Sequence, residues 1–343
     1  RLLRRERGQV HPQVGGDRLS LARAFAVARR VHPRATSPNP RVGCVLVKAG
    51  RVIAEGSHLG FGKAHAEPNA LARAGKRAKG ATAYLTMEPC ARFEGKKTPS
   101  CAEALAAAGV ARVICASLDP NPEVSGRGLA ILRRAGVAVQ RDASFQPEAE
   151  ELNRGFYSRM RRGRPWVILK TALSLDGKAA AASGASRWVT GKPARAAVHA
   201  LRAELDAILV GAGTVLADDP ALTAHGAGKN PLRVVLSGRR RLPRKARVFD
   251  GSAPTLTYLD KSGHVDLGLV LHDLAARGVG TLLVEGGPDV HASFLRAGLV
   301  DEVKVFLAPK LLSGALDPNT APRLRTPRVS RLGDDWLIQG VLG

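Results

Sequence analysis

The stretch that decides the fold of the first half of this chain is His65-Ala-Glu67, followed by Glu88-Pro-Cys90 and then by Cys101. One imidazole and two thiolates can supply three zinc ligands and leave the fourth position open, as a catalytic zinc site requires. Zinc lowers the pKa of a bound water from about 15.7 to about 7, which provides a nucleophile at neutral pH. A carboxylate two residues after the histidine can move protons without binding the metal. We therefore predict that His65, Cys90 and Cys101 bind zinc and that Glu67 transfers protons.

The residues around Cys101 support this prediction. Ser100-Cys-Ala-Glu103 has the form of a capping box, which begins a helix at Cys101. A thiol at a helix N-terminus has a lowered pKa, which favours the metal-binding thiolate. Taken singly, His65 could be an ordinary helix histidine and each cysteine a small core residue. Their order along the chain is the signature of zinc enzymes that deaminate nucleobases, whereas Cys44 and Cys115 lie in apolar strand-like runs and are interpreted as structural.

Hydrophobic periodicity predicts a layered α/β arrangement for the first half. The predicted order is helix, strand, strand, helix, strand, helix, strand, helix, strand, at Leu19–Arg30, Val42–Val47, Arg51–Glu55, His65–Ala74, Thr82–Thr86, Cys101–Ala108, Arg112–Ala116, Gly128–Ala135 and Val137–Val139. A further helix over Pro147–Arg162 leads into a basic linker that ends at Pro165. The break in composition there predicts two domains, over residues 18–160 and 165–343.

The α/β pattern restarts in the second half. Predicted strands lie at Trp166–Lys170, Asp206–Val210, Leu232–Leu236, Thr255–Tyr258, Thr281–Val284 and Glu302–Leu307, and predicted helices at Lys192–Ala203, Leu267–Ala276 and Asp289–Leu295. Gly211-Ala-Gly213 and Gly286-Gly287 follow two of these strands, where glycine lets the backbone approach a ligand and a helix N-terminus can bind phosphate. Gly211-Ala-Gly213 lacks the third glycine of the dinucleotide-binding fingerprint, so we do not predict a Rossmann domain. Either glycine pair could equally form a plain turn.

Composition limits the functional classes. The chain has 343 residues, of which 45% are apolar, and its 53 Lys and Arg against 29 Asp and Glu give a formal net charge of +24. The excess of cations predicts an anionic partner, namely a nucleic acid, a phosphorylated metabolite or a nucleotide cofactor. Aromatic residues make up 4% of the chain, too few for a protein that binds single strands by base stacking.

The sequence also bears on the cellular compartment. No apolar run approaches the ~20 residues that span a bilayer, and no apolar signal segment follows the charged start, so we expect a cytoplasmic protein without a membrane partner. In that compartment four cysteines indicate thiols or metal ligands rather than disulfides. The oligomeric state stays open, a homo-oligomer included.

Five motifs of the first half belong together. They are Ser37-Pro-Asn-Pro-Arg-Val-Gly-Cys-Val-Leu-Val47, His65-Ala-Glu67, Glu88-Pro-Cys90, Thr98-Pro-Ser-Cys101 and Asp119-Pro-Asn-Pro122. They resemble the deaminase half of the bifunctional riboflavin-biosynthesis deaminase/reductase family, in which the two ligand cysteines are far apart. The resemblance implies a cytidine-deaminase-like three-layer domain with the same zinc ligands and proton shuttle. It also implies that Asn39 lines the pyrimidine pocket.

Further motifs resemble the reductase half of the same family. They are Lys170-Thr-Ala-Leu-Ser-Leu-Asp-Gly-Lys178, Ser186-Arg-Trp188, Gly211-Ala-Gly-Thr-Val-Leu-Ala-Asp-Asp-Pro220, Val284-Glu-Gly-Gly-Pro288 and Ala308-Pro-Lys-Leu-Leu312. The resemblance implies a dihydrofolate-reductase-like domain that uses NADPH. It implies cofactor contacts from Ala172, Trp188, Thr214, Asp218, Gly287, Pro288, Asp289, Val290, His291, Ala292 and Ser293. It implies substrate contacts from Ser186, Arg202, Leu222 and Glu285.

The activity implied by the resemblance has two steps of riboflavin biosynthesis. The zinc-dependent half would deaminate 2,5-diamino-6-ribosylamino-4(3H)-pyrimidinone 5′-phosphate, and the NADPH-dependent half would reduce the ribosyl side chain to ribityl. We therefore expect a phosphorylated pyrimidine as the partner and no nucleic acid. Two alternatives are a zinc deaminase acting on nucleic acid such as tRNA, which the charge favours, and a basic, non-enzymatic RNA-binding protein. The cysteine spacing and the second domain argue against the first.

The chain departs from the family pattern at three places. Ala91-Arg-Phe-Glu-Gly-Lys-Lys97 is longer than the usual turn and lacks the histidine that usually follows the first ligand cysteine. His225 stands where an arginine that contacts substrate phosphate is usual. Ser237-Gly238 replaces a pair that usually contains an aspartate.

The run after the strand Leu232–Leu236 predicts a preference for NADPH over NADH. Sites that select NAD place an acidic residue near the adenosine ribose, whereas NADP sites use arginine for the extra phosphate. No acidic residue lies between Leu232 and Ala246, and the basic ones include Arg239, Arg240, Arg241 and Arg244. The pattern does not tell which arginine would carry the preference, because any one of them could lie on a solvated hairpin tip.

Overall fold

The structure, a computed structural model, describes residues 16–92, 100–180, 189–260, 263, 265–313, 323–332 and 335–342. The chain forms two compact units. The N-terminal unit comprises Arg1–Pro165 with Leu271–Gly280, and the C-terminal unit comprises Trp166–Val270 with Thr281–Gly343. Among the described residues, none of the helices combines the length and the apolar character needed to cross a bilayer.

The elements of the first half follow the predicted order, with a short helix before the first strand and two short 3-10 helices added. They are α1 (Gly16–Arg29), α2 (Pro33–Thr36), β1 (Gly43–Lys48), β2 (Arg51–Ser57), α3 (Ala66–Ala74), η1 (Gly75–Ala78), β3 (Thr82–Leu85), α4 (Cys101–Ala107), β4 (Arg112–Cys115), α5 (Arg127–Arg134), β5 (Ala138–Arg141), η2 (Ala143–Phe145), α6 (Gln146–Leu152) and α7 (Arg154–Arg162). The five strands form one sheet in the order β2-β1-β3-β4-β5. The pairs that β1 makes are antiparallel, and β3, β4 and β5 are parallel.

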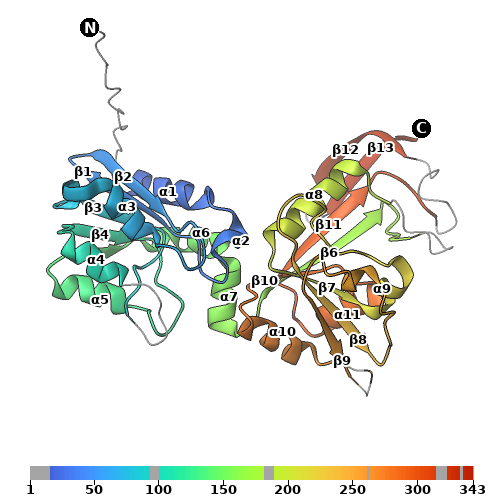
Figure 1. Ribbon diagram of the computed structural model, residues 1–343. Helices are drawn as coiled ribbons and strands as arrows, with labels where there is room; N and C mark the ends of the chain where they lie inside the picture. Colours follow the sequence, from blue (N-terminus) through green and yellow to red (C-terminus); the bar gives the residue numbers. More distant parts are fainter. Residues whose placement is uncertain are drawn as a thin grey trace, which may run out of the picture. The chain divides into compact units, whose positions relative to one another are not determined.

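Helices cover both faces of this sheet, so the predicted three-layer arrangement is confirmed (Figure 1). Side chains of α3, α4 and α5 pack on one face around Leu46 and Leu85. On the other face, α1 and α6 pack around Val45 and Ile114. Because successive strand residues point to opposite faces, adjacent residues such as Val45 and Leu46 belong to different cores. Cys44 and Cys115 are fully buried in β1 and β4, which confirms their structural interpretation.

The predicted single helix over Pro147–Arg162 is wrong, because the chain breaks at Asn153 into α6 and α7. Asn153 has the non-helical angles φ −125° and ψ 31°. Its side-chain oxygen accepts from the backbone N–H of Arg41 at 2.8 Å, and its amide nitrogen donates to the carbonyl of Arg41 at 3.0 Å. These two bonds to a segment 112 residues away explain why local periodicity did not reveal the break.

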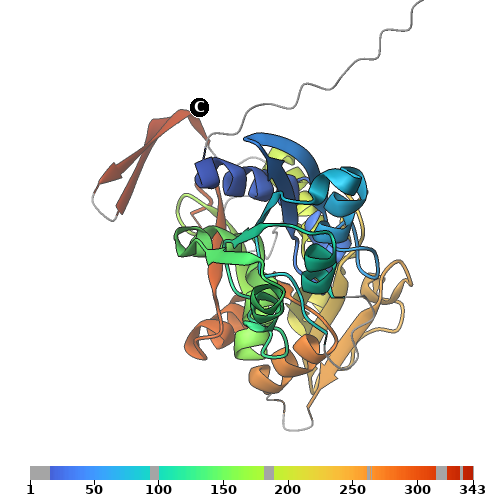
Figure 2. The ribbon, with the colours of Figure 1, turned by 90° about the vertical axis from the view of Figure 1, so that its left-hand side faces the viewer.

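The second half has all the predicted strands and helices and four elements that were missed. Its elements are β6 (Trp166–Ser174), α8 (Lys192–Glu204), β7 (Ala207–Gly211), α9 (Ala212–Asp218), β8 (Leu232–Gly238), η3 (Arg247–Phe249), β9 (Thr255–Leu259), α10 (Leu267–Ala276), β10 (Thr281–Val284), α11 (Pro288–Arg296), β11 (Glu302–Ala308), β12 (Leu324–Leu332) and β13 (Asp335–Leu342). The missed elements are α9, η3, β12 and β13. The hairpin of β12 and β13 is a separate two-stranded ribbon, which Figure 2 shows in profile.

Six strands form the main sheet of the C-terminal unit in the order β11-β6-β10-β7-β8-β9. All neighbouring pairs are parallel. One face packs through Ile208, Val210 and Val235 against residues of α8 and α9. Because ligands of open parallel sheets bind beyond the carboxyl ends of the strands, the turns after β7, β8 and β10 are the expected binding edge.

Candidate deaminase and reductase sites

The predicted zinc ligands come together from three elements. His65 is the residue immediately before α3, Cys101 is the first residue of α4, and Cys90 lies in the segment after β3. The Sγ atoms of both cysteines lie 3.4 Å from Nδ1 of His65, and the three ligand atoms all lie within 4.8 Å of one another. A tetrahedral zinc with ordinary Zn–N and Zn–S bonds holds its nitrogen and sulfur ligands about 3.5 Å apart. The spacing and the donor set therefore fit zinc.

Ser100, the N-cap residue of the predicted capping box, holds Cys101 in place, whereas the Glu103 carboxylate pairs with Arg92. The Ser100 hydroxyl accepts from the backbone N–H of Glu103 at 3.2 Å and donates to the carbonyl of Cys90 at 3.2 Å. The backbone N–H of Ala102 donates to the same carbonyl at 3.3 Å. Ser100 thus caps the helix that begins at Cys101 and links that helix to the segment that carries Cys90.

Glu88 fixes the segment that carries Cys90, a role the sequence did not reveal. Its buried carboxylate accepts backbone N–H groups at the start of α5, from Gly126 at 2.9 Å, Gly128 at 3.0 Å and Leu129 at 3.3 Å. Gly128 has to be glycine, because a Cβ there would lie 1.8 Å from the Pro89 carbonyl oxygen. The ligand segment is therefore pressed directly onto the α5 backbone.

Glu67 lies one residue into α3 and is 3% exposed. Burial raises the pKa of Glu67 to about 7, and the charge of Cys90 acts in the same direction. A carboxyl group whose pKa lies near the ambient pH both accepts and donates protons readily. The environment of Glu67 thus suits the predicted proton shuttle.

A cavity of about 310 Å³ opens beside the ligand cluster. Residues that line it include the predicted Asn39, His65, Glu67 and Cys90. It is also lined by residues with no predicted role, among them His58, Phe61, Lys63, Glu88, Asp119 and Asn121. Asp119 and Asn121 belong to the Asp119–Pro122 motif, and this motif was the sequence feature that could have indicated a place at the site for both residues. Burial raises the pKa of Asp119 to about 7.

His58 orients Asn39 at the cavity wall. Its Nδ1 lies 3.1 Å from the carbonyl oxygen of Ala64, which can only accept, so Nδ1 carries the proton. Nε2 is then the acceptor for the Asn39 side-chain amide at 3.4 Å. Burial lowers the pKa of His58, which favours this neutral form. A lone histidine after a strand carries no sequence signal for such a role.

The larger cavity lies within the C-terminal unit, at the carboxyl ends of β7, β8 and β10, and measures about 1050 Å³. Predicted cofactor or substrate residues that line it are Thr214, Asp218, Glu285, Gly287, Pro288, Asp289, Val290 and Ser293. Within the described part of the chain, Ala172, Arg202, Leu222, His291 and Ala292 are placed but are not among its lining residues. Ser186 and Trp188 lie outside the described residues, as does most of the Ala91–Lys97 departure.

Glu285 is held by two cations at this edge. Arg202 donates to both carboxylate oxygens at 2.8 and 2.9 Å, and Lys170 Nζ lies 3.2 Å from one of them. Burial by itself raises the pKa of Glu285, but the bonds and charges of Arg202 and then Lys170 outweigh it and lower the pKa to about 2. Arg202 thus acts on the cavity through Glu285, and Lys170 is a partner to which the sequence assigned no role.

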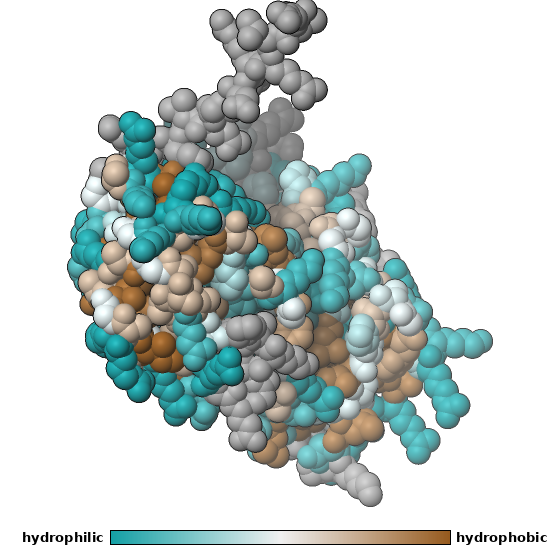
Figure 3. Space-filling view, turned by 60° about the vertical axis from the view of Figure 1, so that its left-hand side comes forward, coloured by the Kyte–Doolittle hydropathy of each residue, from teal (hydrophilic) through white to brown (hydrophobic). Residues whose placement is uncertain are grey.

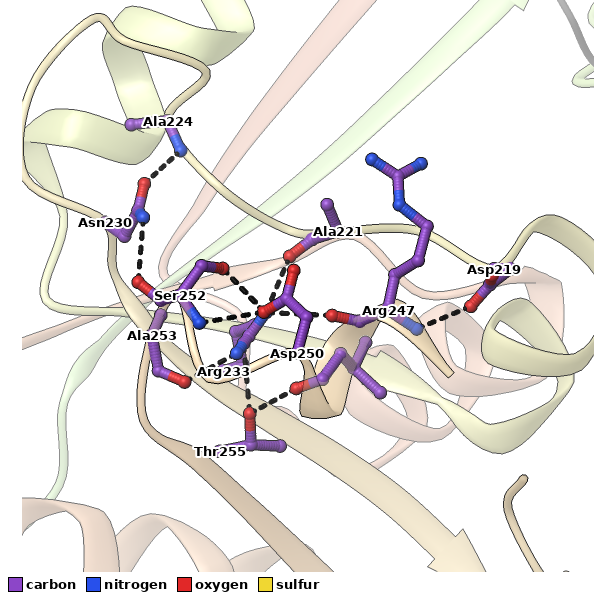
Figure 4. A network of polar contacts seen from close by, with 11 residues as sticks. Asp219, Ala221, Ala224, Asn230, Arg233, Arg247, Asp250, Ser252, Ala253 and Thr255 are labelled. Atoms are coloured by element: carbon purple, nitrogen blue, oxygen red, sulfur yellow. Dashed lines mark hydrogen bonds and ion pairs between the residues drawn. The ribbon is translucent and has the colours of Figure 1, made fainter. Parts of the chain in front are cut away.

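A buried arginine that the sequence did not single out anchors the segment after α9 (Figure 4). Arg233 on β8 is 0% exposed, and its guanidinium donates to the carbonyls of Ala221 and Arg247 at 3.2 and 3.1 Å. It also pairs with Asp250 at 2.9 Å. Asp219 accepts from the Arg247 backbone at 2.8 Å, so the segment carrying Leu222 and His225 is tied at several points.

His225, the departure from the usual arginine, stacks on His199 of α8 with ring centroids 4.3 Å apart. Burial lowers the pKa of His225, and the charges of Arg202 and Arg247 lower it further. His225 is therefore largely neutral at pH 7, unlike the arginine that it replaces.

Two family models match the chain. The "Cytidine and deoxycytidylate deaminase zinc-binding region" matches residues 17–117, and the "RibD C-terminal domain" matches residues 165–338. Riboflavin biosynthesis protein RibD of Escherichia coli is 42% identical over 328 residues, which cover 86% of this chain and 88% of that protein. This chain belongs to the RibD family. The RibD protein of Bacillus amyloliquefaciens is 40% identical and covers 93% of this chain and 94% of its own length.

Solved structures of RibD proteins agree over the whole chain. That of Acinetobacter baumannii RibD has a TM-score of 0.80 at 36% identity and covers 95% of this chain and 99% of its own. The Thermotoga maritima deaminase/reductase has a TM-score of 0.78 at 34% identity and covers 94% and 97%. As a RibD protein, the chain is a riboflavin-biosynthesis enzyme with a zinc-dependent deaminase half and an NADPH-dependent reductase half, as the motifs predicted. The nucleic-acid deaminase and the RNA-binding alternative are not favoured.

On the face shown in Figure 3, clusters of hydrophilic residues lie among apolar ones. Part of the large positive charge pairs with carboxylates, as Arg23 does with Glu55 and Arg161 with Glu150.

Proposed function

We propose that the N-terminal unit deaminates 2,5-diamino-6-ribosylamino-4(3H)-pyrimidinone 5′-phosphate and that His65, Cys90 and Cys101 hold its zinc. The observation that carries the proposal is the cluster of three ligand atoms within 4.8 Å of one another, two of whose residues, His65 and Cys90, line the 310 Å³ cavity. When bound there, zinc supplies a water of lowered pKa beside the pyrimidine ring.

The protein's own groups bind the ring and move the protons. Glu67 accepts a proton from the attacking water and delivers it to the departing ammonia, which suits a carboxyl group whose pKa is about 7. Asn39, oriented by His58, is placed to hydrogen-bond the pyrimidine edge. The ring carbon that carries the 2-amino group loses ammonia and gains the carbonyl oxygen of a pyrimidinedione.

We propose that the C-terminal unit binds NADPH and the deaminated product in its 1050 Å³ cavity. Glycine-rich turns after β7 and β10 line it, and α11 begins at its wall with Gly287 as the preceding residue. The cofactor supplies hydride to C1′ of the opened ribose, and the protein supplies orientation and charge. Of the contacts that the resemblance implies, Thr214, Asp218, Glu285, Gly287–Val290 and Ser293 are supported by the cavity; Ala172, Trp188, His291, Ala292, Ser186, Arg202 and Leu222 remain proposals on the resemblance.

The substrate class and compartment follow from the same sites. The substrate is a small phosphorylated pyrimidine, for which cavities of this size are suited. None of the four cysteines, all of which the structure describes, forms a disulfide, and a zinc site of this kind needs reduced thiols, which the cytoplasm maintains. We therefore propose that the activity is cytoplasmic.

One experiment tests both halves. The diaminopyrimidinone phosphate is incubated with the full chain, with and without NADPH, and the products are analysed by mass. The expected result is loss of an amino group as ammonia without NADPH, and a further gain of two hydrogens when NADPH is present. An unchanged substrate in both reactions, with zinc bound at one per chain, would overturn the deaminase proposal. Deamination without any reduction would overturn the reductase proposal alone.

A further inference from the structure

Two cations among the described residues line the reductase cavity, Arg240 and Arg296. Its acidic lining residues are Asp218, Asp266, Glu285 and Asp289. A dinucleotide with an extra phosphate on the adenosine ribose needs a cation at that phosphate, and guanidinium groups bind phosphate with two parallel hydrogen bonds. The positions of Arg240 and Arg296 in the fold indicate which of the two is placed to bind this phosphate.

Arg240 follows β8 in a tight turn. Its backbone N–H donates to the carbonyl of Ser237 at 3.0 Å, and the hydroxyl of Ser237 donates back to the Arg240 carbonyl. Ser237 is itself buried, so the turn is anchored at the cavity wall. The backbone of Arg240 is therefore held in place before any ligand binds.

The Arg240 side chain lies beside Gly213. A Cβ at Gly213 would lie 3.5 Å from Nη1 of Arg240. Gly213 follows β7, and β7 is the parallel neighbour of β8. The guanidinium of Arg240 thus extends from the end of β8 to the glycine turn that follows β7.

The neighbouring arginines of the run are placed differently. The Arg239 side chain lies toward Gly263, with Nε 3.2 Å from the position that a Cβ would take there. Within the described part of the chain, Arg239, Arg241 and Arg244 are not among the lining residues of the cavity. The structure therefore separates one member of the run from the other three, a distinction that the sequence did not offer.

We infer that Arg240 binds the 2′-phosphate of NADPH and is the residue that makes this reductase prefer NADPH to NADH. The inference rests on the proposed binding of NADPH in this cavity. In doubly wound sheets the residue that reads the 2′ position lies near the end of the strand next to the glycine turn. Here that place is the end of β8, where Ser237 and Gly238 leave no acid to accept from a 2′-hydroxyl. Arg296 belongs to α11, on the side of β10.

The test compares the full-length parent with R240A, with R239A and R241A as matched controls and with R296A as the competing candidate. The probes are 2′,5′-ADP and 5′-AMP, measured by calorimetry, and kcat/KM for NADPH and for NADH. R240A is expected to lose about 10- to 100-fold in affinity for 2′,5′-ADP and in kcat/KM for NADPH, because one charge-assisted pair is removed. Its affinity for 5′-AMP and its kcat/KM for NADH should stay within about twofold.

R239A and R241A are expected to keep the parent's preference, and R240E should shift it toward NADH, because a carboxylate repels the phosphate and accepts from the hydroxyl. A selective loss of 2′,5′-ADP binding in R296A, or an undiminished preference in R240A, would overturn the assignment and leave the reductase proposal standing. A parent that reduces the deaminated product with neither cofactor would instead overturn the proposed function, and with it this inference.

Discussion

Glu67 and Glu285 are both buried glutamates, one in each unit, and their pKa values move in opposite directions. Burial raises the pKa of Glu67 to about 7. At Glu285 the effect of burial is outweighed by Arg202 and Lys170, and the pKa falls to about 2. The partners supplied by the fold, rather than the residue type or its depth, thus decide whether a buried carboxyl group exchanges protons or keeps a fixed charge.

This difference agrees with the chemistry proposed for each cavity. A deamination has two proton movements per turnover, and a carboxyl group with a pKa near neutrality serves both. A reductase receives its hydride from the cofactor, so its site gains from permanent charges that orient the substrate. Four substitutions sharpen or break the comparison, the largest expected effect first.

Replacing Glu67 by Gln removes the exchangeable proton and keeps the side chain's size. We expect deaminase turnover to fall by about 10²- to 10⁴-fold, while zinc content and NADPH-dependent reduction stay at the parent's level. Ammonia release, metal analysis and reduction of the separately supplied deaminated product measure the three quantities. Deamination at a near-normal rate would show that another group carries the protons.

Replacing Arg202 by Met leaves Glu285 buried with one cation fewer. Breaking a buried pair on one side costs about 3–5 kcal/mol, so unfolding in urea should begin at lower concentration and reductase kcat/KM should fall. The Glu285 pKa is depressed in the folded protein, so its stabilising contribution is complete above about pH 4.5 and is lost as the pH falls toward 2. In R202M the folded-state pKa of Glu285 is depressed less, so this acid-induced loss of stability should be smaller and should be complete at a higher pH. R202K, which retains a cation, is the matched control, and unchanged unfolding in R202M would contradict the role.

Replacing Glu88 by Gln tests whether the deaminase site also depends on one fixed carboxylate. Glu88 accepts three backbone N–H groups at the start of α5 and so holds the Cys90 segment. Loss of a group that orients a metal-binding segment typically lowers metal affinity about 10- to 100-fold. Competition with a chelator measures this affinity. An E103Q variant, which changes an exposed glutamate of α4, controls for the loss of charge.

Replacing His225 by Arg restores a permanent charge at an exposed site beside Arg202. The pKa of His225 is lowered, so the parent's charge there appears only below pH 6.5, and its reductase KM should fall as the pH is lowered. H225R should have the lower KM already at pH 7.5 and little dependence on pH. Exposed charge pairs contribute about 0.2–1 kcal/mol, so the change in KM should be at most about fivefold. Parallel pH profiles for parent and variant would rule out a contact between His225 and substrate phosphate.

Residue identity and short-range pattern were enough for most of the fold. The periodicity of Leu21, Phe25 and Ala28 predicted α1, and alternating or apolar runs predicted the main-sheet strands, because these signals depend on neighbours a few residues away. Ser100 and Glu103 predicted the start of α4 for the same reason. Strand β12 was missed, since Leu324–Leu332 contains three arginines and a proline and shows no regular alternation. The largely apolar run Asp335–Leu342, which forms β13, was missed as well.

The sequence alone also predicted the chemistry of the deaminase half. The order of His65, Glu67, Cys90 and Cys101 limits which metal these residues can bind and which reaction they can catalyse. Only the tertiary structure decided which polar groups meet in each unit. Asn153 interrupts a helix and binds Arg41. The buried Arg233 donates to the carbonyls of Ala221 and Ala253. Arg240 lines the reductase cavity, whereas Arg239 does not. In each case the partners are brought together only by the folded chain, and the free energy of a buried polar group depends on those partners.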